Sequence, residues 1–233
     1  MLEKHLSSQF DVELGQISTL VLQMGGMVES QLHQAIYALQ HLSVETADQV
    51  MKLEDKVDSM EIEIDREISS VIGRRQPTAR DLRLLIGVSK TTANLERAGD
   101  EATRIACMVK SIIDSGMPRS LPTSELRVAS ELATGALRKV LDAFARLDVE
   151  ASLAIINDDL HLDAEYDGFL RKLITYMMED PRTISPSLNL LFLAKAVERI
   201  GDHAKNIAEA TIYIVRGTDV RHTTPEQREA ALQ

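Results

Sequence analysis

The chain has 233 residues, of which 44% are hydrophobic, 27% are charged and only 3% are aromatic. A formal net charge of −10 argues against a nucleic-acid partner and favours cations, or a basic patch on another protein. The single cysteine, Cys107, excludes an intramolecular disulfide and any cysteine-rich zinc site. We find no apolar stretch typical of a signal peptide or a membrane span, and therefore expect a cytosolic, mostly helical protein.

Prolines divide the chain into segments with helical periodicity. Proline in a helix interior costs about 3 kcal/mol, so the six prolines, of which Pro77 is the first, mark loops. Residues 114–122 form the central linker. From Arg216 onward the apolar periodicity is lost, which predicts a mobile tail that could carry a short frayed helix. The helices predicted, in chain order, cover residues 7–41, 44–72, 78–113, 123–147, 149–178 and 186–215.

The two halves of the chain repeat one another. LERAGDEATRIA at 95–106 aligns with VERIGDHAKNIA at 197–208, and seven of the twelve positions are identical. Upstream, LSVE at 42–45 aligns with LDVE at 147–150. A coincidence of helical patterning would match apolar positions, but not glutamate, arginine, glycine and aspartate together. The sequence therefore predicts an internal duplication.

The duplication predicts an all-α fold of two tandem three-helix bundles related by pseudo-twofold symmetry. The first repeat is assigned to residues 1–116 and the second to residues 117–216. The remaining residues, 217–233, are assigned to the mobile tail.

Each half carries two pairs of carboxylates four residues apart. Residues at that spacing share a helix face with their Cβ atoms about 5–6 Å apart, so two such charges repel unless something offsets them. Two pairs on facing helices would surround a cation with the oxygen ligands that hard and borderline cations prefer. The predicted metal ligands are Glu54, Asp58, Glu96 and Asp100 in the first half, and Asp159, Asp163, Glu198 and Asp202 in the second.

A single acidic pair is usually solvated surface, but four pairs at equivalent positions of a duplicated chain favour a shared role. Asp159 also falls on the apolar stripe of its helix, where burying an unpaired carboxylate is costly. The alternative to metal binding is that these carboxylates form ion pairs with Arg97, Arg104 or Arg199.

Glycine interrupts the same helix of each repeat, at Gly99 and Gly201, although it costs about 1 kcal/mol relative to alanine there. These glycines indicate either close helix contact or space for an ion and its waters. His161 and His203 lie next to the carboxylates in sequence, but their spacing points the rings away from the carboxylate face, so we do not predict them as ligands.

Motifs that carry catalysis are absent from the sequence. We find no Walker A loop, GxGxxG, HExxH or GxSxG. The Glu-x-x-His motif of di-iron carboxylate bundles is also missing. We therefore expect a binding protein and not an enzyme. The alternatives are a carboxylate-bridged metalloenzyme on a helical bundle and a purely structural helical spacer.

The repeated motifs resemble those of the PhoU family, and the resemblance covers essentially the whole chain. It rests on the two ER-x-GD segments, on the acidic pairs, on YMMEDPRTI at 176–184 and on RGTDVRH at 216–222. The second repeat matches the family more closely, because Ala98 stands where isoleucine is more typical and Glu101 where the second half has His203.

The resemblance implies two three-helix bundles, commonly in a homodimer, whose acidic pairs bind a divalent or trivalent metal ion. The oxygen ligands leave the identity of the ion open among magnesium, manganese, zinc, calcium and iron. The resemblance also implies a negative regulator of the phosphate-starvation (Pho) response. Such a protein acts through the phosphate ABC transporter, chiefly its ATPase subunit PstB, and through the sensor histidine kinase PhoR. It is cytoplasmic and reaches the membrane only through these partners.

Overall fold

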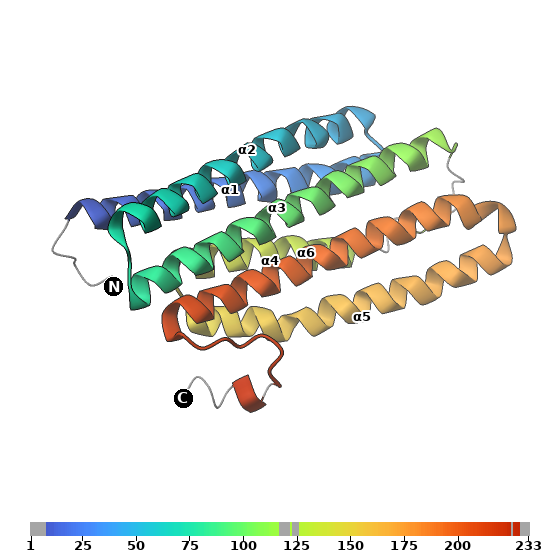
Figure 1. The fold of residues 1–233 in the computed structure, drawn as a ribbon. Coiled ribbons are helices and arrows are strands. Elements are labelled where there is room, and N and C mark those ends of the chain that lie inside the picture. The colour runs from blue at the N-terminus through green and yellow to red at the C-terminus, as the bar shows by residue number, and fades with distance from the viewer. Residues whose placement is uncertain (1–7, 117–121, 123–125, 225, 229–233) are drawn as a thin grey trace.

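A computed structural model of the chain describes residues 8–116, 122, 126–224 and 226–228 (Figure 1). All regular elements within these residues are helical, which confirms the all-α prediction. They are α1 (Ser8–His41), α2 (Val44–Arg75), α3 (Ala79–Asp114), α4 (Leu126–Arg146), α5 (Val149–Glu179), the 3₁₀ helix η2 (Pro181–Thr183) and α6 (Ile184–Arg216).

The turn between the first and second helices has the same local geometry in both repeats. Leu42 and Leu147 both have positive φ angles, of 51° and 53°, and so reverse the chain after a helix. The next residue then caps the following helix. The Ser43 side chain accepts a hydrogen bond from the Thr46 amide, and the Asp148 side chain accepts one from the Ala151 amide. The repeated L-S/D-V-E segment is therefore a repeated turn and N-cap.

The predicted helix boundaries differ from the observed ones mainly at proline and at the central linker. The last helix begins at Ile184, two residues before the predicted start at Pro186. Proline is tolerated there because the amides of the first helical turn have no acceptor within the helix. The predicted start of the fourth helix, at residue 123, lies outside the described residues.

The six helices form two three-helix bundles that meet along α3 and α6. Helices α1, α2 and α3 contact one another, as do α4, α5 and α6, and α1 also touches α4. Figure 1 shows α3 and α6 side by side through the middle of the molecule. The two helices approach closely at Gly87 of α3, where an added Cβ would overlap the side chain of Ile214 on α6.

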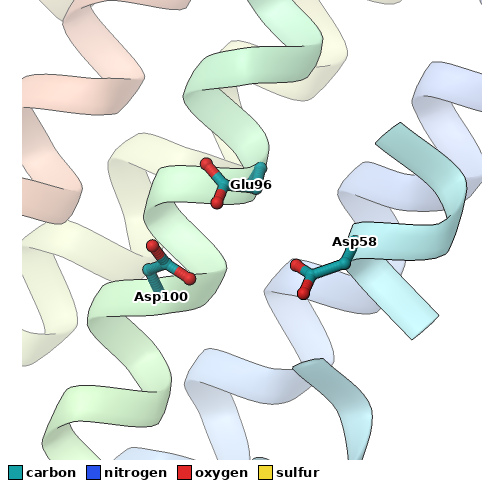
Figure 2. A group of neighbouring side chains, drawn as sticks. All are labelled: Asp58, Glu96 and Asp100. Atoms are coloured by element: carbon teal, nitrogen blue, oxygen red, sulfur yellow. The ribbon is translucent and has the colours of Figure 1, made fainter. Parts of the chain in front are cut away.

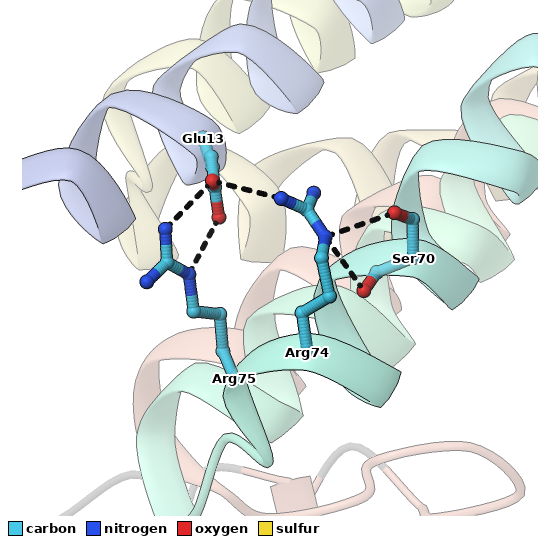
Figure 3. A network of polar contacts seen from close by, with 4 residues as sticks. All are labelled: Glu13, Ser70, Arg74 and Arg75. Atoms are coloured by element: carbon cyan, nitrogen blue, oxygen red, sulfur yellow. Dashed lines mark hydrogen bonds and ion pairs between the residues drawn. The ribbon is translucent and has the colours of Figure 1, made fainter.

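Polar contacts fix the first bundle at two levels. At one end, Glu13 of α1 accepts hydrogen bonds from Arg74 and Arg75 at the end of α2 (Figure 3). The hydrogen bond from Arg75 is the main cause of the lowered pKa of Glu13. In the interior, the buried Gln31 amide donates to the backbone oxygen of Val50 at 3.3 Å and to Thr103 Oγ1 at 3.0 Å. Gln31 therefore links α1 to both α2 and α3.

The chain beyond α6 lies against the bundles where it is described. Gly217, with φ of 74°, ends α6 by donating its amide to the Tyr213 oxygen. Val220 is completely buried, a contact that the loss of periodicity does not predict. The mobility of residues 217–233, and the division of the repeats at residues 116 and 216, stay predictions. Within the described residues, no helix combines the length and apolarity needed to cross a membrane.

Replacement of Gly87 by alanine tests the closeness of the α3–α6 contact. The added methyl group would press on Ile214, and overpacking of this kind costs about 1–3 kcal/mol, partly offset by the roughly 1 kcal/mol helical preference for alanine. We expect Gly87→Ala to lower the free energy of unfolding by up to roughly 2 kcal/mol in urea denaturation. Gly135→Ala, whose Cβ would meet nothing within 4 Å, should be neutral or stabilising. Equal effects of the two substitutions would contradict the close contact.

Candidate metal centre

Three of the predicted ligands in the first repeat converge between α2 and α3. Asp58 lies on α2, while Glu96 and Asp100 lie one turn apart on α3. Each of the three offers one carboxylate oxygen, and these oxygens all lie within 4.8 Å of one another. Figure 2 shows Asp58 reaching across from its helix toward the two carboxylates on α3. The three residues, called here the first acidic cluster, could hold one cation.

Two further carboxylates border the first acidic cluster. Glu54, the fourth predicted ligand, has a raised pKa, first because of burial and also because Asp100 and Asp58 repel its charge. Glu61 was not among the predicted ligands. Its pKa is raised by burial and by neighbours that include Asp58 and Asp100. The signal for Glu61 was available in the sequence, because it lies three residues after Asp58 and seven after Glu54, on the same helix face.

The first acidic cluster concentrates negative charge without an internal counter-ion. Burial raises the pKa of Glu96 to about 7, with further contributions from Asp100, Glu61 and Asp58 that outweigh the opposing effect of Arg97. The pKa of Asp58 is raised for the same reasons, burial first and then Asp100. Within the described residues, no lysine or arginine forms an ion pair with the cluster. The donor chemistry and the excess charge therefore fit a metal ion.

None of the three arginines proposed as alternative partners forms an ion pair with the first acidic cluster, and two of them are engaged elsewhere. Arg199 donates to Glu101 Oε1 at 2.8 Å, and Arg104 Nε lies 3.4 Å from the other oxygen of that carboxylate. Arg97 forms no ion pair with any described residue. Ion pairing with these arginines therefore does not account for the first acidic cluster.

The four predicted ligands of the second repeat also lie near one another, between α5 and α6. Burial and the charges of Asp159 and Glu198 raise the pKa of Asp163, and burial and the charges of Glu198 and Asp159 raise that of Asp202. We call these four residues the second acidic cluster. The structure thus brings the predicted carboxylates of each repeat together across two helices.

The second acidic cluster differs from the first because it contains its own cations. Lys205 Nζ lies 2.7 Å from Asp159 Oδ2, and Lys195 Nζ lies 2.6 Å from a Glu198 oxygen. At the alignment offset of the ER-x-GD motifs, the first repeat has Ala93 and Thr103 at these two positions. Two ammonium groups therefore partly neutralise the second cluster, and nothing equivalent neutralises the first.

The mid-helix glycines serve close packing. A Cβ on Gly99 would lie 3.1 Å from Gln31 Oε1 and 3.4 Å from Val57 Cγ1, inside the first bundle. A Cβ on Gly201 would overlap Leu162 of α5. Of the two roles predicted for these glycines, close helix contact is the one that their neighbours support.

The two histidines beside the acidic residues lie in different surroundings. His161 is exposed on α5. His203 faces α3, where its Nδ1 is 3.1 Å from Asn94 Oδ1. Burial, followed by the charges of Arg97 and Arg199, lowers the pKa of His203 to about 4, so its ring is neutral near pH 7.

Two helical bundles joined along their third helices, each with carboxylates gathered between two helices, define a tandem-repeat helical binding protein. The sequence profile of the PhoU domain matches residues 21–109 and 126–211, one match in each bundle. The chain belongs to the PhoU family, which confirms the resemblance seen in its motifs.

Relatives match along nearly the whole chain. A "phosphate-specific transport system accessory protein PhoU homolog" from Burkholderia sp is 47% identical over 97% of both chains. The corresponding PhoU protein of Escherichia coli K12 is 43% identical over 99% of this chain and 95% of that protein. The crystal structure of PhoU from Pseudomonas aeruginosa superposes with a TM-score of 0.87 at 42% identity, covering 90% of this chain and all of the other.

A more distant structure confirms the fold alone. The phosphate transport system regulatory protein PhoU from Streptococcus pneumoniae is 24% identical and superposes with a TM-score of 0.84 over 91% of this chain and 99% of that one. The PhoU family, to which the chain belongs, is a family of accessory and regulatory proteins and not of enzymes.

The charge of the first acidic cluster predicts the pH dependence of the metal-free protein. Glu96 keeps its proton in the folded state up to a pH of about 7, whereas the unfolded chain releases it near 4.5. The folded state therefore binds more protons in this window, and stability falls as the pH rises through it. Because Glu96 is partly solvated, we expect its carboxyl group to contribute a loss of about 1 kcal/mol between pH 5 and 7.5 in urea denaturation with chelator. The lowered pKa of His203 contributes in the opposite direction, so the part due to Glu96 is the difference between the wild type and a Glu96 variant.

Replacement of Glu96 isolates this effect. Glu96→Gln should remove the falling contribution, so the slope of the free energy of unfolding against pH should become more positive than in the wild type. Glu165→Gln, at an exposed position of α5, should keep the slope of the wild type. A slope that Glu96→Gln leaves intact would count against the raised pKa of Glu96.

Proposed function

We propose that this protein is a metal-binding negative regulator of the phosphate-starvation (Pho) response and a modulator of phosphate uptake. The observation that carries the proposal is the full-length similarity, at 43–47% identity, to proteins named as accessory to phosphate-specific transport. The protein acts as an adaptor between the phosphate ABC transporter, through its ATPase subunit PstB, and the sensor histidine kinase PhoR. It works in the cytoplasm as a homodimer and meets the membrane only through these partners.

The shape of the protein supports a role as an adaptor. Its helices run up to 36 residues and leave several large apolar side chains exposed. Met178 is 80% exposed, Leu160 is 71% exposed and Phe192 is 55% exposed, and all three lie on helices of the second bundle. Long helices with exposed apolar groups can contact a partner helix or domain.

Asp58, Glu96 and Asp100 would hold the metal ion, with Glu54 and Glu61 beside them. A magnesium, manganese, zinc, calcium or iron ion there would neutralise the repulsion that raises the pKa of Glu96. The ion would also link α2 to α3, and so would fix the spacing of these helices. Metal occupancy can therefore alter the surface that a partner meets.

The second acidic cluster, Asp159, Asp163, Glu198 and Asp202, is proposed as a weaker metal site. The ammonium groups of Lys195 and Lys205 already occupy part of the space and satisfy part of the charge that a metal ion would meet. A cation that enters this cluster must displace the two lysine ammonium groups or be repelled by their charge. The two repeats are therefore expected to differ in metal affinity although their carboxylates correspond.

Exchange of a single residue between the repeats tests this difference. Ala93→Lys places a lysine three residues before Glu96, as Lys195 stands before Glu198. We expect Ala93→Lys to weaken Mn²⁺ binding to the first acidic cluster about tenfold or more in calorimetric titration. Lys195→Ala should strengthen binding to the second cluster. Gln16→Lys, which adds the same charge at an exposed site of α1, should have little effect.

The metal titration has outcomes that would overturn the assignment. Asp100→Asn should abolish the tighter of any two Mn²⁺ binding events. If Asp100→Asn leaves Mn²⁺ binding intact, or if Ala93→Lys and Gln16→Lys have the same effect, the tighter site lies elsewhere.

A phosphate-starvation reporter tests the regulatory role. In high phosphate, a strain lacking this gene should express the reporter, and the wild-type gene should restore repression. Asp100→Ala with Asp202→Ala, compared at equal soluble protein levels, then separates the contribution of the acidic clusters from that of the fold. If the deletion leaves the reporter silent in high phosphate, the proposed regulatory function is wrong.

A further inference from the structure

A cavity of about 760 Å³ lies where the two bundles meet. Asp100 and Asp202 of the two acidic clusters reach its wall, but its other lining residues belong to neither cluster. Its walls come from α3, from α6 and, beyond α6, from residues 221–223 and Arg228. This volume falls in the range of small-molecule sites, about 300–1,000 Å³. The cavity therefore has room for a ligand larger than a single metal ion.

The cavity is positively charged although the chain as a whole is strongly negative. Four acidic side chains line it, against six lysines and arginines, so the lining has a net charge of about +2 while the chain carries −10. The acidic residues are Asp100, Glu101, Asp202 and Glu209, and the basic residues are Arg97, Arg104, Arg199, Lys205, Arg221 and Arg228.

Four of the six basic side chains already have carboxylate partners. Arg104 and Arg199 share Glu101, as described above. Lys205 contacts Asp159, and Arg221 Nε donates to the Asp219 carboxylate at 2.9 Å.

The other two basic side chains, Arg97 and Arg228, have no ion pair with any described residue. Among the described residues, the Arg228 guanidinium makes one hydrogen bond, to the Thr223 backbone oxygen at 3.3 Å, and its buried Nε has no partner there. Arg97 is exposed and Arg228 is partly buried, so both guanidinium groups are available to an anion that enters the cavity.

The arginine of the ER-x-GD motif is the part of that motif that the acidic clusters do not use. Arg97 and Arg199 occupy equivalent positions in the two repeats, and both line this cavity at the α3–α6 contact. Because each arginine follows its cluster glutamate directly, the helix turns the two side chains to different faces. The duplication thus contributes one arginine from each repeat to a single cavity.

We propose that this cavity binds the phosphoryl group of a small anion, with Arg97 and Arg228 as its direct ligands. The planar guanidinium matches the paired oxygens of a phosphoryl group. The two guanidinium groups together offer more N–H donors than a single carboxylate could accept. The source of the phosphoryl group is inorganic phosphate or a phosphate chain, such as that of a nucleotide. This inference stands on the cavity alone and does not require metal binding or the regulatory function.

Glu209 sets a limit on the anion affinity. Its carboxyl group is 8% exposed, faces the charges of Lys205, Arg228 and Arg221, and forms no ion pair with a described residue. An anion in the cavity would be repelled by the ionised form of this carboxyl group. Removal of its charge should therefore tighten binding, a gain that a misfolded variant cannot imitate.

Calorimetric titration of the full chain, freed of metal with chelator and kept at low ionic strength, tests the proposal. The probes are inorganic phosphate, tripolyphosphate and ATP. We expect Arg97→Gln and Arg228→Gln each to weaken binding about tenfold or more, because each removes a charged hydrogen-bond donor. Glu209→Gln should strengthen binding several-fold, because it removes one repulsive interaction between the carboxylate and the anion.

Arg171→Gln is the matched control, because Arg171 is an exposed arginine of α5 that does not line the cavity. It should leave the affinity of every probe unchanged. Tighter binding of tripolyphosphate and ATP than of phosphate would identify a phosphate chain as the ligand, and the reverse order would identify the free ion. If none of the three anions binds at millimolar concentration, or if Arg171→Gln weakens binding as much as Arg97→Gln, the proposal is wrong.

Discussion

The close contact between α3 and α6 joins the two bundles and sets the two acidic clusters on either side of one shared cavity. Both helices carry the ER-x-GD motif, whose successive residues point in different directions around the helix axis. The glutamate and aspartate face the neighbouring helix of their own bundle, α2 or α5, and form the acidic clusters. The glycine faces the bundle interior, and the arginine faces the cavity between the bundles. A short motif, used twice, thus builds two clusters and one shared cavity.

The duplication has preserved the carboxylates of the two repeats, but not their electrostatic surroundings. In the second repeat Lys195 and Lys205 provide positive charge within the fold. The second acidic cluster therefore needs less positive charge from a dissolved cation. In the first repeat Ala93 and Thr103 provide none, and the pKa of Glu96 records the resulting repulsion. Equivalent ligand positions therefore do not make equivalent sites, because neighbouring residues decide how much charge remains for an ion to neutralise.

The sequence predicted the features that depend on local spacing. Helical period located the six helices, and the i,i+4 rule grouped the carboxylates that the structure brings together. The L-S/D-V-E repeat corresponds to the turn at Leu42 and Leu147. Features that depend on which helices become neighbours could not be predicted in the same way. The ion pair of Lys205 with Asp159 joins residues 46 apart, and the cavity joins residues of both repeats and the chain beyond them.

The segment after α6 has different consequences for the fold and for the cavity. Only Val220 anchors it in the core, whereas Arg221, Thr223 and Arg228 form part of the cavity wall. Substitutions in this segment that spare Val220 can therefore change what the cavity accepts while leaving the helical bundles intact. Ligand preference can in this way diverge between proteins of the same architecture, through a few residues that contribute little to folding.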